Sequence, residues 1–176
     1  MKLLRRVGWD SDVYPSWQKA MHYQVEPSSV IWQDIPESTN WWLAIIEPED
    51  IDFLYAIGSA DWRKIFGSFR ITEIQRRFED LQEVEHLPDD PFEHVERIKT
   101  LARLDLEETN FEPLIMVCGS EHGSMMAIDG NHRMIAYLVN QQLVDKSVYL
   151  GIHESIPLHY EWYRYAVYDE KTNTQT

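Results

Sequence analysis

A short segment between residues 129 and 133 carries the side chains that could do chemistry. It reads Asp129-Gly130-Asn131-His132-Arg133, so a carboxylate, an imidazole and a guanidinium follow one another closely. An arginine fork matches the geometry of phosphate oxygens, and a histidine exchanges protons near neutral pH. The carboxylate could accept a substrate proton, orient a neighbour or contact Mg²⁺. These residue types together point to phosphate binding, with or without catalysis.

The elements expected around this segment would make it an anion site. The apolar run at 125–128 predicts a strand, and the apolar stripe that starts at 134 predicts a helix to about residue 141. Glycine at the turn between them allows a backbone conformation that side chains resist. The helix start exposes unpaired amides and carries partial positive charge. We therefore expect the anion ligands to be Gly130, Asn131, His132 and Arg133. The candidates for catalysis are Asp129 and His132.

Each of these side chains also has an ordinary structural interpretation. Asp129 is a residue type that often caps a helix N-terminus. His132 could be a hydrogen-bonded group of the interior, and Arg133 could pair with one of the many acids of the chain. The pattern alone leaves the phosphate site and the structural interpretation open.

The cysteine and the remaining histidines of the chain limit which disulfide, thiol and metal sites are possible. Cys118 is the only cysteine, which excludes an internal disulfide and a zinc site with several thiolates. It falls in the apolar run at 114–118, which predicts a buried strand where a thiol is typically a small hydrophobe. We expect no metal site, because no recurring ligand spacing is present in the set Glu121, His122, His132, His153 and His159.

Length and charge limit the class of protein. The 176 residues suit one compact domain, and 30 acidic against 16 basic residues give a net charge of −14. Such a field repels phosphate backbones and anionic lipid, which argues against non-specific DNA binding. The chain has no apolar run near the roughly 20 residues of a membrane span, and no apolar segment follows its basic start as in a signal peptide. We expect a cytoplasmic protein that does not bind membranes.

The chain divides into three stretches. Residues 1–41 form a tryptophan-rich arm, expected to be irregular and packed on the core, with a first strand at about 42–46. Residues 42–153 form the central domain, with helices expected at 48–57, at 73–84 and from 90, followed by strands at 114–118, 125–128 and 147–152. Residues 154–176 are a C-terminal extension with a frayed end. The arm, or the acidic helices between 71 and 112, could bind a protein partner.

The central domain resembles the ParB/sulfiredoxin superfamily. Pro113-Leu114-Ile115-Met116-Val117 is similar to the "PLxV" strand of these proteins, and Asp129 to Arg133 to their D-G-x-H-R turn before a helix. The similarity is close over 113–138 and loose over 42–152. It implies an α+β fold, a small mixed sheet flanked by helices, in which this turn binds nucleotide phosphates. The implied ligand is ATP or another nucleoside triphosphate, with Mg²⁺ if phosphate is transferred.

This sequence differs from two kinds of member of the family, and these differences argue against their activities here. The catalytic cysteine of the sulfiredoxin reductases falls at Asn131 here, so we expect no sulfinic-acid reduction. The partition proteins carry a helix-turn-helix downstream, for which the residues after 152 leave little room.

Two kinds of function remain. The first is a nucleotide-binding phosphotransferase or nucleotide hydrolase, with Asp129 as base or Mg²⁺ contact and with Glu47, Glu49 or Asp50 as a second carboxylate. The alternative is a non-catalytic module that senses a ligand or binds a protein. If the turn binds a nucleotide, we expect Arg133→Ala to weaken that binding at least about tenfold.

Overall fold

The computed structural model describes residues 1–21, 34–81, 92–104 and 111–173. Its six strands are β1 (Lys2–Val7), β2 (Asn40–Ile45), β3 (Leu54–Tyr55), β4 (Leu114–Cys118), β5 (Met125–Asp129) and β6 (Ser147–Ile152). They form one sheet in the order β1-β2-β6-β4-β5-β3. The pairs β4–β6 and β3–β5 are parallel, and the other neighbours are antiparallel. The expected α+β class with a mixed sheet is confirmed.

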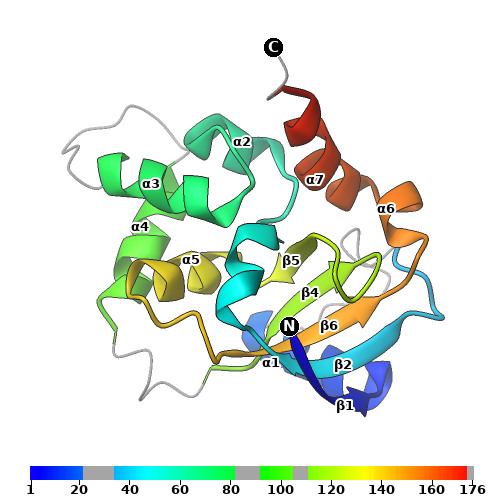
Figure 1. Cartoon of the computed structure of the whole chain (residues 1–176). Helices are drawn as coiled ribbons and strands as arrows, with labels where there is room; N and C mark the ends of the chain where they lie inside the picture. Colours follow the sequence, from blue (N-terminus) through cyan, green and yellow to red (C-terminus); the bar gives the residue numbers. More distant parts are fainter. Residues whose placement is uncertain (22–33, 82–91, 105–110, 174–176) are drawn as a thin grey trace.

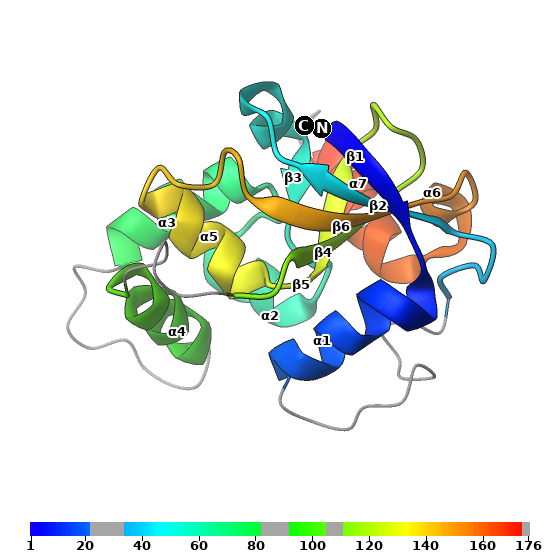
Figure 2. The same ribbon diagram turned by 90° about the horizontal axis from the view of Figure 1, so that it is seen from below.

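Helices surround this sheet (Figure 1). They are η1 (Trp9–Val13, π), α1 (Tyr14–Met21), η2 (Pro48–Phe53, 3₁₀), α2 (Ala60–Phe66), α3 (Ile71–Leu81), α4 (Phe92–Ala102), α5 (Asn131–Val139), α6 (Ile156–His159) and α7 (Glu161–Asn173). In Figure 1, α3, α4 and α5 gather on the left of the sheet, and α6 and α7 lie on the right. The view in Figure 2 shows α1 below the sheet. No helix in the described ranges is long and apolar enough to cross a membrane.

The elements that lead into the 129–133 segment form as expected. β4 and β5 are an antiparallel hairpin, all five residues of β4 are buried, and β6 pairs with β4. α5 then starts directly after Gly130. The helix expected at 73–84 is present as α3 up to Leu81, and the helix expected from residue 90 is present as α4. The expected residues 82–84 and 90–91, and Trp32 of the arm, lie outside the described residues.

The helix expected at 48–57 is wrong in its second half. The chain forms the 3₁₀ helix η2 up to Phe53 and then the short strand β3, which pairs in parallel with Met125 and Met126 of β5. Residues 54–57 are all buried. Their apolar side chains therefore pack in the core from an extended chain and do not form one face of a helix. A short apolar run fits either structure, and tertiary pairing decided between them.

The arm is also more regular than expected. β1 forms the outer edge of the sheet beside β2, and α1 follows it. Four of the six residues of β1 are exposed, so the strand has no apolar alternation that the sequence could reveal. Trp17 and Trp41 are buried in the same core cluster as the central strands.

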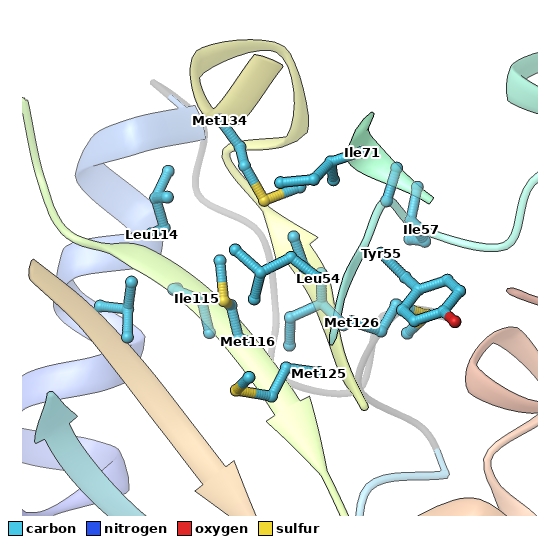
Figure 3. Packing of buried hydrophobic residues seen from close by; sticks show 14 of the residues in the cluster. Leu54, Tyr55, Ile57, Ile71, Leu114, Ile115, Met116, Met125, Met126 and Met134 are labelled. Atoms are coloured by element: carbon cyan, nitrogen blue, oxygen red, sulfur yellow. The ribbon is translucent and has the colours of Figure 1, made fainter. Parts of the chain in front are cut away.

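The core joins the sheet to the helix that carries the site. Figure 3 shows side chains of β3, β4 and β5 packed together, with Met134 of α5 against Ile71 of α3. Met134 and Ile71 are both fully buried. This packing fixes the first turn of α5 relative to the end of β5, where the candidate residues lie.

Candidate functional site

The chain makes a sharp left-handed turn at Gly130, between β5 and α5. Gly130 has φ 81° and ψ 17°, and a Cβ there would come within 2.4 Å of Leu114 Cδ2 and 3.0 Å of Arg133 Nη2. The position therefore requires glycine. Met134 N–H donates to the Gly130 carbonyl at 2.8 Å, and no described side chain caps the helix. The amides of residues 131–133 precede this first helical hydrogen bond, and no described group accepts a hydrogen bond from them.

Arg133 is engaged within the protein. Its Nη2 donates to Asp129 Oδ2 at 3.0 Å, and its Nη1 donates to the Glu112 carbonyl oxygen. The guanidinium lies over the Phe111 ring, 5.6 Å from the centroid, and the residue is only 9% exposed. The Arg133 guanidinium thus stabilises the turn. This agrees with the structural interpretation in which Arg133 pairs with an acid of the chain.

Asp129 is held by the same contacts. Burial raises the pKa of Asp129, while the Arg133 charge, a hydrogen bond from the Gly130 backbone and the Arg97 charge pull that pKa down. Its Oδ2 accepts the Arg133 hydrogen bond and does not cap α5. The carboxylate is therefore part of the frame of the turn.

The second carboxylates considered from the sequence lie at η2. Asp50 is 5% exposed, and its Oδ2 accepts the Glu47 N–H at 2.7 Å in a capping box. Within the described ranges, no hydrogen bond or ion pair links Glu47, Glu49 or Asp50 to the 129–133 segment. Asp50 therefore has a structural partner at η2 itself.

Asn131 connects the turn to the segment before α2. Its Oδ1 accepts the Ile57 N–H at 2.9 Å, and the residue is 9% exposed. Asn131 is the position at which the resemblance would put the catalytic cysteine of a sulfiredoxin reductase, and an amide cannot act as that nucleophile. The cysteine in β4 does not replace it, because burial raises the pKa of Cys118 to about 12 and the thiol has no exposed surface.

His132 forms a pair with His94 of α4. His132 Nε2 lies 2.7 Å from His94 Nδ1, and the two rings stack with centroids 4.9 Å apart. Trp62 of α2 packs against both rings at 5.2 and 5.3 Å. Burial, together with the charges of Arg97 and His94, lowers the pKa of His132 to about 3. His132 is therefore neutral at physiological pH and is not poised for proton transfer to a substrate there.

Arg97 is an exposed cation on α4 whose charge acts on this turn. It lies on α4, three residues after His94, and its charge lowers the pKa of His132 and opposes the rise at Asp129. Sequence reasoning missed both His94 and Arg97, which precede the turn by more than thirty residues. One signal was present: a spacing of three puts them on one face of α4, beside the inward-facing Val95 and Ile98.

A pocket of about 750 Å³ lies between the start of α2 and the start of α7. Gly58, the residue after the Asn131 partner Ile57, contributes to its wall. Trp162 and Tyr165 are its aromatic lining residues, and the Tyr165 ring contacts Phe69 and Arg63. The polar lining residues are Ser59, Asp61, Glu161 and Arg164.

A second histidine constellation is not set up for nucleophilic catalysis. His153 Nε2 lies 3.0 Å from Ser38 Oγ, and His153 Nδ1 accepts the Ser155 N–H at 3.1 Å. Because Nδ1 accepts this hydrogen bond, the ring proton is on Nε2, which donates to Ser38. The imidazole therefore cannot take a proton from the Ser38 hydroxyl in this arrangement.

No group of three or more His, Cys, Asp or Glu side chains among the described residues could hold a metal ion. Comparisons with protein-family models, curated proteins and solved structures found no match to the chain.

Proposed function

We propose that this chain binds an oxyanion at the start of α5, most simply the phosphate chain of a nucleotide. The observation that carries the proposal is the uncapped first turn of α5, entered through a left-handed glycine. Its amides and the positive end of the helix dipole suit a phosphate oxygen. Arg97, which is exposed, supplies the cation in place of the buried Arg133.

The occupied side chains favour binding over turnover. Asp129 accepts from Arg133, and His132 is bonded to His94 and is neutral. A phosphotransferase or hydrolase would have to release one of them to obtain a base. We therefore place the non-catalytic, ligand-sensing alternative ahead of the enzyme, with Asp129 and His132 retained as the candidates for catalysis.

The pocket beside α7 offers a place for the rest of a nucleotide. It starts at Gly58, one residue from the Asn131 contact, and Trp162 and Tyr165 are among its lining residues. Aromatic rings bind bases of every kind by stacking. We expect Trp162→Leu to weaken nucleotide binding while leaving the binding of inorganic sulfate unchanged.

The test is a thermal-shift and calorimetric screen with ATP, ADP, CTP and GTP, each with and without Mg²⁺. We expect at least one nucleotide to raise the Tm and to bind without release of product. Product release would favour the enzyme instead. The absence of any shift and of any heat of binding would overturn the proposal.

A pair of variants separates the anion site from general charge effects. Arg97→Gln removes the exposed cation beside the turn, and we expect it to weaken nucleotide binding about fivefold or more. Arg103→Gln makes the same charge change just after α4 and should leave affinity unchanged. Equal losses in both variants would contradict a local role for Arg97.

A further inference from the structure

We propose that the His94–His132 pair is a proton site coupled to the anion site, so that a bound oxyanion and one extra proton stabilise each other. The inference rests on the proposed function and adds its regulation: the occupancy of the site depends on pH. It is carried by the contact between the two rings and by their position beside the first turn of α5.

The geometry makes the two imidazoles one titrating unit. His94 Nδ1 and His132 Nε2 lie 2.7 Å apart, a distance at which one nitrogen must donate and the other accept. The His132 side chain belongs to the residue whose backbone amide is one of the three at the helix start. A charge on the pair is therefore close to an anion bound there.

Proton uptake leaves the contact intact. In the neutral pair, the donating ring holds its proton between the two rings, and its outer nitrogen is bare. The added proton binds to that outer nitrogen, so an imidazolium now donates to a neutral imidazole. A second extra proton would have to occupy the position of the shared one, which the short contact prevents. The pair thus takes up one proton at most.

Burial and the surrounding charges together determine when this happens. Burial is the largest cause that lowers the pKa of His94, and Arg97 adds to it, while Asp61 of α2 and Glu93 of α4 favour the charged ring. At His132, burial, Arg97 and His94 all lower the pKa. A bound dianion offsets Arg97, which is the main opposing charge in the described region, and so raises the proton affinity of the pair.

Sulfate is the suitable probe, because it is a divalent oxyanion that does not itself titrate between pH 5 and 8. Because the pKa values of His94 and His132 are both lowered, the extra proton binds below the ordinary histidine range, and we expect the sulfate Kd of the wild-type protein to fall by about threefold or more from pH 6.5 to 5.0. Linkage allows at most about tenfold per pH unit for one proton. Imidazole NMR should show the pair titrating at higher pH with saturating sulfate than without it. This second measurement needs no variant.

The variant His94→Gln keeps a hydrogen-bonding side chain next to His132 but removes the titrating pair, so the pH dependence of sulfate binding should flatten. His153→Gln removes the histidine bonded to Ser38 and Ser155 and should keep the wild-type slope. Sulfate binding with unchanged titration of both rings would overturn the coupling alone. If neither sulfate nor any nucleotide binds, the anion site itself is wrong and the coupling falls with it.

Discussion

At the scale of single residues, the turn after β5 is built from groups that satisfy one another. Arg133 neutralises Asp129, Asn131 accepts from Ile57, and His132 pairs with His94. What remains for a ligand is backbone amide and the exposed Arg97. Side chains that look reactive in the sequence therefore shape the turn, and the proposed ligand contacts fall to the backbone amides and Arg97.

The buried Arg133–Asp129 pair predicts a large stability effect. Arg133→Ala leaves the Asp129 carboxylate buried without its ion-pair partner, so we expect the free energy of unfolding to fall by about 3 kcal/mol. Urea denaturation at pH 7 measures this. Arg77→Ala, which removes an exposed pair with Asp80, should cost well under about 1 kcal/mol. Similar losses in the two variants would contradict the bracing role, and nucleotide affinity must be compared only in folded protein.

The depressed pKa of His132 predicts loss of stability in acid. Below the ordinary histidine pKa of 6.5, the unfolded chain binds a proton that the folded chain excludes until about pH 3. The free energy of unfolding should therefore fall with falling pH, by up to about 1.4 kcal/mol per pH unit from this group. Urea denaturation between pH 7 and 5 tests this. His132→Gln should flatten the slope, whereas a similar flattening in His122→Gln, at an exposed loop position, would contradict the assignment.

The sequence located this site but not its partners. Asp129 to Arg133 follow a clear strand and precede a clear helix, so their place in the fold could be predicted. The partners His94, Ile57 and Phe111 come from segments brought together only by tertiary packing. No local spacing encodes such contacts, and for that reason the buried state of Arg133 could not be foreseen.

At the scale of elements, α7 is attached to the domain through its backbone. A Cβ at Gly58 would come within 2.2 Å of the Trp162 carbonyl oxygen and 2.9 Å of Ala166 N. Two main chains therefore approach as closely as glycine allows, at the edge of the pocket. The position of the pocket wall depends on this contact.

Gly58→Ala should displace α7. Because the obstructing atoms are backbone, the helix must move as a unit, and we expect a stability loss of about 1–3 kcal/mol. Hydrogen exchange in residues 161–168 should accelerate more than exchange in β4. Gly123→Ala is the matched control, because its Cβ would meet nothing nearer than Ser120 Oγ at 3.2 Å and the Ser120 carbonyl oxygen at 3.4 Å. Unchanged exchange in α7 would show that the contact does not hold the helix.

The elements that could be predicted are those with strong internal patterns. β4 is a continuous apolar run, and α3 carries apolar residues on one face, so both lie where the sequence places them. β3 was mistaken for helix because Leu54 and Ile57 fit a helical spacing as well as an extended chain. β1 has no apolar pattern at all, since only its pairing with β2 makes it a strand.

At the scale of the whole molecule, one core connects all three stretches of the chain. Val13 and Trp17 from the arm, Ile115 from the central domain and Tyr160 from the C-terminal stretch belong to a single buried cluster. The arm is therefore continuous with the domain in structural terms: β1 extends the sheet, and Trp17 fills its core.

Trp17→Ala should consequently weaken the entire fold. We expect about 3–5 kcal/mol of destabilisation, because a fully buried aromatic side chain is lost. Exchange protection in β4 should fall together with protection in α1, since both depend on the same cluster. Loss of protection confined to residues 1–21 would show instead that the arm unfolds on its own.

The outermost strand has a consequence for how copies of this chain meet. β1 leaves one row of backbone groups unpaired by any described strand, and it carries Lys2, Arg5 and Arg6 on its exposed positions. A second copy approaching this rim to continue the sheet would align like charges at close range, which is a recognised protection against fibrous stacking. In an otherwise acidic protein, the positive charges of Lys2, Arg5 and Arg6 thus disfavour the pairing of two β1 strands. Neutralising these side chains should promote aggregation.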